Sequence, residues 1–486
     1  MKPIAAIVAA LDDTGLLVAP FSETFQVTGI AEDSRKVAAG TLFCAIEGTA
    51  VDGHDFLRDA SDRGAAAALV THRNDIALPQ IMVSDSRHAA GVAAREFYDN
   101  PTDEMTLVGV TGTNGKTTTV AIIQHLLNSR GSASTIGTLG AIDGAGKHLT
   151  GYASLTTPGP VEFQAVLADL KSHGVTHVAC EASSHGLDQR RLHSVSFDAA
   201  VYTNLTHEHL DYHHDLESYA AAKMELSQLV SSGGVEVLNA DDPTWSAIPE
   251  RSDIRRLHYG RASRAEVRAT DEQPIDSGTS CTFCFGDAKH YVRLPLLGEY
   301  NVANALAAAA AVWGIGVEPA LIVERLADAP QVPGRMERLW SGEFNVLRDY
   351  AHTPDGFERA IRTIRAITPG RLVVLFGCGG DRDRDKRSIM ASITAGLADL
   401  VVITDDNPRT EDPQRILDDV ESGLGHVERL RIPDREEGIH RAVSLLRSGD
   451  CLLLLGKGHE TYQIYGTEKM PFDEPSIVRA AVGQSR

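Results

Sequence analysis

The sequence predicts an α/β protein of three domains, built around mostly parallel sheets with helices on both faces. The chain has 486 residues, which is too many for one ordinary hydrophobic core. From Met105 onward, short apolar runs alternate with helix-like segments. Turn-forming residues gather at 99–102 and at 330–334 and divide this pattern. The expected domains are 1–101, 102–331 and 332–486.

The first domain is expected to be a small α/β unit. Its opening apolar run is interrupted by Asp12 and Asp13, where a secretory signal would have its cleavage region. We therefore expect an N-terminal helix rather than a signal peptide. Short strands are expected at 41–46, 66–70 and 80–83, between alanine-rich helical segments.

In the second domain, the alternation predicts a doubly wound, mostly parallel sheet. Strands are expected at 107–110, 177–180, 199–203 and 235–238, helices at 117–129 and 301–313, and a β-rich stretch at 254–297. The third domain is expected to be a separate α/β domain with strands at 344–347, 372–376, 400–403 and 451–455. Ligands of such sheets bind at the carboxyl ends of the strands, so the loops after these strands are the expected site.

Composition limits the possible functions. The formal net charge of -20 argues against a general nucleic-acid-binding protein, which relies on clustered Lys and Arg. No apolar run approaches the ~18 residues of a membrane span. The six cysteines are widely spread, as is typical of a protein in a reducing cytoplasm. Cys281 and Cys284 are expected to be buried strand residues, because zinc or redox use would need a second pair.

The most informative motif is Gly109-Val-Thr-Gly-Thr-Asn-Gly-Lys-Thr-Thr-Thr119, which lies between an expected strand and an expected helix. Backbone N–H groups in such a loop hold a polyphosphate, while Lys116 reaches the outer phosphates and the Thr117 hydroxyl binds Mg²⁺. Val110 stands where the strict Walker A pattern has glycine, so the loop is a variant. The alternative is a glycine-rich turn with an incidental lysine.

Two further segments of the second domain carry candidate metal ligands. Glu181 ends an expected strand and is well placed to bind Mg²⁺, although it could instead cap the next helix. Residues 204–215 place four histidines close to three carboxylates, and spacing alone does not choose among them. Lys223 follows on an expected helix, where a surface lysine is the ordinary interpretation.

In the third domain, four polar loops follow four apolar strands, at 349–355, 377–383, 405–409 and 456–460. Together they describe one ligand-facing rim at the carboxyl ends of the strands. The rim offers both signs of charge, which suits a ligand that carries carboxylate and amine groups. The charged side chains are Arg382, Asp406, Arg409 and Glu460.

Across nearly its whole length, the chain resembles the Mur ligase family. Besides the phosphate loop and the rim loops, the matching motifs are Asp33-Ser-Arg-Lys-Val, Asp52-Gly-His, Thr156-Thr-Pro158, Glu181-Ala-Ser-Ser-His, His209-Leu-Asp-Tyr-His, Gly298-Glu-Tyr-Asn-Val-Ala-Asn304, Pro333-Gly-Arg-Met-Glu337 and Asp349-Tyr-Ala-His-Thr-Pro-Asp355. The resemblance implies a P-loop central domain, a Rossmann-like C-terminal domain and an N-terminal domain for a uridine nucleotide.

The resemblance also implies roles for individual residues. ATP would be held by Gly112, Thr113, Asn114, Gly115, Lys116, Thr117, Thr118, Asn304 and Arg335. Mg²⁺ would be held by Thr117, Glu181, His209 and Lys223, the last as a carbamate, and Lys116 would complete the catalytic set. The UDP-linked sugar–peptide would contact Ser34, Thr156, Thr157, Ser183, Gln189 and Arg191. The incoming amino acid would contact Arg382, Asp406, Asn407, Pro408, Arg409, Gly456 and Glu460.

The implied reaction is ATP-dependent addition of meso-diaminopimelate to the D-Glu γ-carboxylate of UDP-N-acetylmuramoyl-L-Ala-D-Glu, through an acyl phosphate, in peptidoglycan precursor synthesis. Asp406-Asn-Pro-Arg409 resembles the signature of diaminopimelate-adding enzymes, and a guanidinium suits a distal carboxylate that L-lysine lacks. The implied protein is a cytoplasmic monomer that inserts into no membrane and binds no nucleic acid.

Alternatives remain open. Leu155 stands where the family often has Asn, and His207-Glu208 where Arg-Asp is more familiar. A Mur-type ligase for another acid and amine, the L-lysine-adding form or a folylpolyglutamate synthase would share the ATP machinery. A P-loop motor or switch protein would need no four-loop rim, and a metal or redox module would need a second ligand pair beside Cys281 and Cys284.

Overall fold

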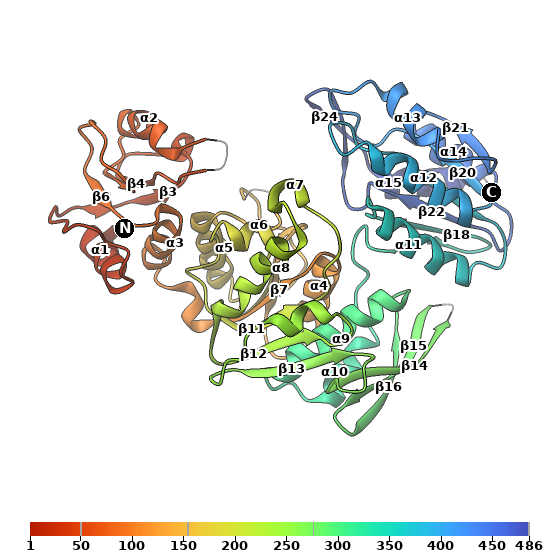
Figure 1. Ribbon diagram of the computed structural model, residues 1–486, viewed down its shortest axis with the longest axis horizontal. Helices are drawn as coiled ribbons and strands as arrows, with labels where there is room; N and C mark the ends of the chain where they lie inside the picture. The colour runs from red at the N-terminus through yellow and green to blue at the C-terminus, as the bar shows by residue number, and fades with distance from the viewer. Residues whose placement is uncertain (49–50, 153–154, 276, 485–486) are drawn as a thin grey trace. The chain divides into compact units, whose positions relative to one another are not determined.

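The computed structural model describes residues 1–48, 51–152, 155–275 and 277–484 (Figure 1). The chain forms two compact units. Unit 1 comprises Met1–Thr270, Thr282–Val292 and Ala303–Ala327, and unit 2 comprises Asp271–Cys281, Arg293–Val302 and Asp328–Arg486. Unit 1 holds the small N-terminal sheet and most of the phosphate-loop sheet, and unit 2 holds the C-terminal sheet.

The N-terminal part of unit 1 is a four-stranded parallel sheet with helices packed against it. Its strands, in order across the sheet, are β3 (Gly29–Ala31), β4 (Thr41–Cys44), β5 (Ala67–Val70) and β6 (Gln80–Met82). Its helices are α1 (Ile4–Asp13), α2 (Leu57–Asp62) and α3 (Ser86–Phe97), and β1 (Lys2–Pro3) pairs with β2 (Gln26–Val27). The expected N-terminal helix is therefore confirmed as α1. Small buried alanines of α3 let α1 and α3 pack closely on the sheet.

The large sheet has the strand order β16-β15-β14-β13-β12-β11-β7-β10-β8-β9. Its strands are β7 (Thr106–Thr111), β8 (Ala133–Gly137), β9 (Gly140–Ile142), β10 (His177–Glu181), β11 (Phe197–Tyr202), β12 (Val230–Asn239), β13 (Arg255–Gly260), β14 (Val267–Ile275), β15 (Gly278–Phe285) and β16 (Ala288–Leu294). From β13 to β8 every neighbouring pair is parallel, as the sequence predicted. Cys281 and Cys284 are buried in β15, which confirms the prediction for this pair.

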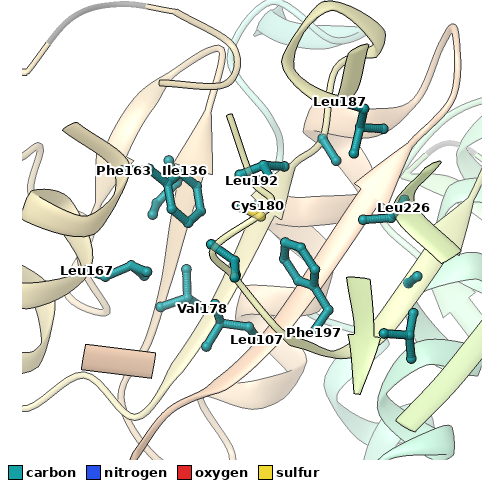
Figure 2. Packing of buried hydrophobic residues seen from close by; sticks show 14 of the residues in the cluster. Leu107, Ile136, Phe163, Leu167, Val178, Cys180, Leu187, Leu192, Phe197 and Leu226 are labelled. Atoms are coloured by element: carbon teal, nitrogen blue, oxygen red, sulfur yellow. The ribbon is translucent and has the colours of Figure 1, made fainter. Parts of the chain in front are cut away.

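Helices cover this sheet and bury its apolar strands. They are α4 (Lys116–Leu127), α5 (Pro160–Ser172), α6 (Ser184–Asp188), α7 (Leu210–His213), α8 (Leu216–Met224), α9 (Glu299–Gly314) and α10 (Pro319–Leu326). Figure 2 shows Phe163 and Leu167 of α5 against Ile136 and Val178 of the sheet. All four side chains are almost fully buried, and truncating one such side chain to alanine costs about 2–5 kcal/mol.

Unit 2 contains a six-stranded sheet with the order β17-β18-β22-β19-β20-β21. Its strands are β17 (Glu337–Ser341), β18 (Asn345–Asp349), β19 (Leu372–Phe376), β20 (Leu400–Ile403), β21 (Glu428–Arg431) and β22 (Cys451–Leu455), with a hairpin of β23 (Tyr462–Tyr465) and β24 (Glu468–Pro471). Only β17 is antiparallel to its neighbour within this sheet. Its helices are α11 (Pro354–Ile367), α12 (Asp385–Leu397), α13 (Pro413–Glu421), α14 (Arg435–Ser444) and α15 (Glu474–Gln484).

The sheet of unit 2 is doubly wound because alternate residues of its strands enter two separate cores. In β19, Leu372, Val374 and Phe376 pack with α11, α12 and α13, whereas Val373 and Leu375 pack with α14 and α15. This period of two follows from the pleat of a strand, and burial of both faces explains the continuous apolar runs in the sequence. Among the described helices, none is long and apolar enough to cross a membrane.

Candidate active site

The phosphate loop lies between β7 and α4, where two glycines are required by both conformation and space. Gly112 and Gly115 have φ of +138° and +87°, which side chains strongly disfavour. A Cβ on Gly115 would lie 2.3 Å from Oδ1 of Asn304, and a Cβ on Gly112 would overlap the Thr203 hydroxyl. Val110 is a buried residue inside β7, so the departure from Walker A falls in the strand and leaves the loop intact.

The segment that follows β11 holds the phosphate loop in place. The Thr113 N–H donates to the Asn204 carbonyl (2.7 Å), and the Asn114 N–H donates to Oδ1 of Asn204 (3.0 Å). The Thr203 hydroxyl donates to the Asn114 carbonyl (2.7 Å). Since β11 neighbours β7 in the sheet, these contacts follow from strand order. Sequence reasoning missed this role of Thr203 and Asn204, although Thr203 ends a predicted strand and Asn204 follows it.

Two lysine ammonium groups converge on the carbonyl oxygen of Gly112. Nζ of Lys116 lies 2.8 Å and Nζ of Lys223 lies 2.9 Å from that oxygen. Lys223 is 1% exposed, and its Nζ lies 4.4 Å from the centre of the Tyr219 ring. Burial, reinforced by the charge of Lys116, lowers the pKa of Lys223 well below its usual value. Lys223 is therefore not the surface lysine that a helical position ordinarily indicates.

The oxygen donors expected for Mg²⁺ lie at the same edge of the sheet. Thr117 is a buried residue of the first turn of α4, and Glu181 ends β10, the other neighbour of β7. The Glu181 carboxylate accepts hydrogen bonds from the Thr138 N–H (2.8 Å) and hydroxyl (3.1 Å). Ser183, not Glu181, caps α6, so the alternative of a helix cap at Glu181 is wrong. A hydroxyl and a carboxylate are ligands that suit Mg²⁺.

His209 lies at the start of α7 with φ of +58°, and its side chain is about half exposed. Its ring lies 4.9 Å from the His185 ring and 6.1 Å from the Tyr219 ring, measured between centroids. The structure thus places His209 beside α6 and α8, the two helices that carry Ser184–Asp188 and Lys223.

Four of the six residues predicted for the sugar–peptide form one hydrogen-bond network. The Thr157 hydroxyl donates to the Glu181 carbonyl (2.7 Å) and accepts from the Ser183 N–H (3.0 Å). Arg191 donates to the Thr157 carbonyl (2.7 Å) and to Oε1 of Gln189 (2.8 Å). This network connects the loop at 156–158 directly to the strand that ends in Glu181.

The remaining residues of this set are placed less centrally. The Thr156 hydroxyl lies 3.2 Å from the Thr138 hydroxyl, close to the Glu181 carboxylate. Leu155 is 48% exposed. Ser34 is a buried residue of the short helical turn Ser34–Lys36 in the N-terminal part of unit 1.

Glu32, two residues before Ser34, links the N-terminal sheet to α5. Its carboxyl group accepts from the backbone N–H groups of Val161 and Glu162, at the start of α5. Gly159, the N-cap residue, has no side chain to do this, and a Cβ there would lie 2.2 Å from Oε1 of Glu32. Glu32 directly follows β3 of the N-terminal sheet, and it caps α5, which covers the large sheet. Burial raises the pKa of Glu32 to about 7.

A second cluster of possible metal ligands lies in the N-terminal part of unit 1. Ligand atoms of Glu47, His54 and His72 all lie within 4.8 Å of one another. However, Nδ1 of His54 lies 2.7 Å from Oδ1 of Asp52, and Nε2 of His54 accepts from the Thr71 N–H (3.1 Å). Because both ring nitrogens of His54 are engaged, the cluster is a structural link between loops.

In unit 2, the predicted rim loops all follow the carboxyl ends of parallel strands. Arg409 has φ of +53°, and its guanidinium donates to the Gly380 carbonyl (2.8 Å). Gly380 approaches the Pro408 carbonyl so closely that a Cβ would overlap it. Arg382 is exposed. The geometry of Asp406, Asn407 and Glu460 depends on a buried lysine that sequence reasoning did not single out.

Arg335, predicted to help bind the nucleotide, is also a residue of unit 2. Its guanidinium lies 4.7 Å from the centre of the Tyr350 ring. The neighbouring Asp349 accepts from the Met336 N–H (2.7 Å) and the Ala351 N–H (2.8 Å), and burial raises the pKa of Asp349. Asn304, the other predicted nucleotide residue outside the loop, belongs to unit 1 and contacts the phosphate loop through the Thr119 hydroxyl (3.4 Å).

Three family models match the chain in order. They are described as Mur ligase family, catalytic domain (residues 26–101), Mur ligase middle domain (110–312), and Mur ligase, glutamate ligase domain (334–458). Curated relatives include a UDP-N-acetylmuramoyl-L-alanyl-D-glutamate–2,6-diaminopimelate ligase of Geobacillus kaustophilus, 40% identical over 94% of this chain and 95% of the relative. A ligase of the same name from Agrobacterium fabrum is 40% identical over 94% of each chain.

Solved structures show the same fold. A structure of a UDP-N-acetylmuramoyl-L-alanyl-D-glutamate–2,6-diaminopimelate ligase has a TM-score of 0.71 and 31% identity, and covers 96% of this chain and 97% of its own. A MurF ligase from Thermotoga maritima, solved in complex with ADP, has a TM-score of 0.66 and 20% identity, with 94% and 97% covered. The three-domain α/β fold is confirmed, and the boundaries at 101/102 and 331/332 stay predictions.

Replacing Gly115 with alanine should weaken nucleotide binding at least tenfold, because the new methyl group displaces Asn304 and strains the loop. Gly174→Ala is the matched control, since Gly174 also has positive φ (+77°) but has nothing within 4 Å of a Cβ. Calorimetric titration with ATP measures both. Equal losses in the two variants would contradict the assignment of the effect to the Asn304 contact.

Glu32→Gln should change how stability depends on pH. The Glu32 carboxyl group keeps its proton up to about pH 7 in the folded protein but loses it near its usual pKa of 4.5 when unfolded. Wild-type stability relative to Glu32→Gln should therefore fall as pH rises from 5 to 8, by up to about 3 kcal/mol. Urea unfolding at both pH values measures this, with the exposed Glu23→Gln as control. A constant offset would rule out the buried, protonated state.

Proposed function

Since this chain belongs to the Mur ligase family, we propose that it adds meso-diaminopimelate to the D-Glu γ-carboxylate of UDP-N-acetylmuramoyl-L-Ala-D-Glu. The chain is a ligase that forms an amide bond at the expense of ATP, in the synthesis of peptidoglycan precursors. The observation that carries the assignment of the acid substrate is the network of Thr157, Ser183 and Arg191, which is tied to Glu181 beside the phosphate loop.

The proposed chemistry has two steps. The substrate carboxylate attacks the γ-phosphorus of ATP, the bond to the β–γ bridging oxygen breaks, and ADP leaves behind an acyl phosphate. The amine of the amino acid then attacks the acyl carbon, loses a proton, and expels inorganic phosphate. Lys116 offsets charge on the phosphates, and the Thr157 network orients the carboxylate. Bound Mg²⁺ would supply further charge compensation to the phosphates.

The proposal includes carbamylation of Lys223. Only a neutral amine reacts with CO₂, and the lowered pKa of Lys223 favours that form. A carbamate there would place a carboxylate-like group near Lys116, whose ammonium group contacts the same Gly112 carbonyl. It would also add oxygen ligands to those of Thr117 and Glu181, and His209 would complete the set.

The rim of unit 2 supplies the side chains proposed to bind the incoming amino acid. Arg409 offers a guanidinium for the distal carboxylate of diaminopimelate, and Asp406 and Glu460 offer carboxylates for an ammonium group. The side chain of L-lysine ends in an ammonium group alone and would leave Arg409 without an anionic partner. The six cysteines are all buried and widely spread along the chain, which is consistent with the proposed cytoplasmic location.

Phosphate release from ATP tests the proposal directly. The purified protein should release phosphate with the UDP-linked dipeptide and meso-diaminopimelate, and mass spectrometry should find the UDP-linked tripeptide. Parallel reactions with L-lysine and with D-glutamate identify the alternatives. Product with L-lysine but not with diaminopimelate would contradict the role of Arg409, and no product with any amine would favour a Mur-type ligase for another substrate pair.

Arg409→Ala should lower kcat/KM for diaminopimelate by about 100-fold, since a charge-assisted bidentate contact is worth roughly 2–3 kcal/mol. The Kd for ATP should stay within twofold. Arg415→Ala, which removes an exposed arginine of α13, is the matched control. Loss of ATP affinity equal to the loss of amino-acid use would argue against the assigned role.

Carbamylation of Lys223 predicts a carbon-13 resonance when the protein is equilibrated with labelled bicarbonate. Lys223→Gln should lose this resonance together with at least 99% of the ligase activity, because the variant cannot supply the additional oxygen ligands. Lys469→Gln, which removes an exposed lysine of β24, should keep both. A resonance that persists in Lys223→Gln would show that another amine is modified.

A further inference from the structure

Lys457 is a fully buried lysine under the rim of unit 2. It follows β22 and lies between Gly456 and Gly458, whose φ values are +101° and +52°. The side chain is 0% exposed. Lysine is almost never fully buried unless its charge is paired, and Lys457 lies next to two carboxylates.

The Lys457 ammonium group joins three rim residues. Nζ donates to Oδ1 of Asn407 (2.6 Å) and to Oε2 of Glu460 (3.1 Å), and it lies 3.1 Å from Oδ1 of Asp406. Nδ2 of Asn407 donates to the same Oε2 of Glu460 (2.8 Å). Lys457, Asn407 and Glu460 therefore form a closed triangle of hydrogen bonds, with Asp406 as a second carboxylate on the same cation.

This arrangement fixes the orientation of the Asn407 amide. Its Oδ1 accepts from Lys457 and also from the Ile464 N–H (3.0 Å), so this atom must be the oxygen. Its nitrogen is then left to donate to Glu460. The side chain of Asn407 thus serves to hold Glu460, and the position of the Glu460 carboxylate depends on Lys457 by two routes.

The hairpin β23–β24 holds the same loop from its other side. The Arg409 N–H donates to the Ile464 carbonyl (3.0 Å), and the Gly466 N–H donates to the Arg409 carbonyl (2.7 Å). The Gln463 amide donates to the Asp406 carbonyl (3.1 Å). The loop that carries Asp406 and Arg409 is therefore held on one side by backbone hydrogen bonds to the hairpin and on the other by the buried ammonium group of Lys457.

The charges of the cluster do not cancel. One buried ammonium group faces two carboxylates, whose side chains are 12% and 16% exposed for Asp406 and Glu460. The exposed side of the cluster is thus negative, and the positive charge lies behind it. The shared ammonium group offsets the repulsion between the two carboxylates that it contacts.

We propose that Lys457 is a positioning residue for the amino-acid substrate, which holds Asp406, Asn407 and Glu460 in the arrangement that receives an ammonium group of the incoming diamino acid. The inference rests on the proposed function for the identity of that acid, but it concerns residues of unit 2 alone. Lys457 is shielded from solvent by the groups that it holds, and it acts through them.

The test compares Lys457→Met with Lys469→Met in the full-length protein. Both remove a lysine next to the Tyr462 ring, but Lys469 is exposed and contacts no rim carboxylate among the described contacts. Lys457→Met should raise the KM for meso-diaminopimelate at least tenfold and leave the KM values for ATP and the UDP-linked dipeptide within twofold. Lys469→Met should match the wild type in all three.

A comparison of KM with kcat supplies a readout that a purely structural role would not give. In Lys457→Met, kcat at saturating diaminopimelate should stay within about threefold of the wild type while the KM rises, because Lys457 acts on the carboxylates that bind the substrate and not on the reacting atoms. A loss of kcat with an unchanged KM would overturn the inference.

A double variant covers the case in which Lys457→Met does not fold. Lys457→Met with Glu460→Gln removes one negative charge together with the cation, so thermal unfolding should recover toward the wild-type midpoint while diaminopimelate use stays impaired. Wild-type KM for diaminopimelate in either folded variant would overturn the inference, as would equal increases in all three KM values. If the wild type joins another amino acid instead, the proposed function fails, and the same comparison is made with that acid.

Discussion

The site of unit 1 depends on how the phosphate loop is held, and above all on the Gly112 carbonyl oxygen. That single acceptor receives two lysine side chains, one from the helix after the loop and one from α8. The N–H groups of the loop are fixed by Asn204, which follows the neighbouring strand. Strand order therefore brings three segments, distant in sequence, to one point before any nucleotide arrives. Such preorganisation is what phosphoryl transfer requires of a protein, because most of its catalysis is positioning and charge compensation.

Unit 2 must also hold its loops in fixed positions, and it does so through different contacts. The rim loops that we propose to bind the amino acid also follow the carboxyl ends of parallel strands, but they carry charged side chains rather than exposed backbone N–H groups. Such side chains need partners to stay ordered. Here the partners are the buried ammonium group of Lys457 and the hairpin β23–β24. Both units thus place rigid strands under loops and leave the chemistry to the loops.

The sequence predicted the fold well because its signals are local. Apolar runs of four to six residues, which enter cores on both faces, can hardly be anything but strands of a doubly wound sheet. The phosphate loop was equally readable, since its glycines must occupy positive φ. What could not be read were pairings across the sheet and between sheets. Nothing near Thr203, Glu32 or Lys457 in the sequence reveals their distant partners, because Asn114, Val161 and Asn407 each lie at least 50 residues away from them along the chain.

The cap that Glu32 provides for α5 has a consequence for how this protein can be divided. The helix begins at Pro160 after a glycine, so its first N–H groups obtain their acceptor from a sheet whose last strand ends at Met82, far earlier in the chain. A fragment that starts at the middle domain would expose those groups and the face of α5 that packs against α3. A chimaera that takes its first domain from a relative must bring a carboxyl or amide acceptor at the same place. The natural unit for transplantation is therefore the first two domains together.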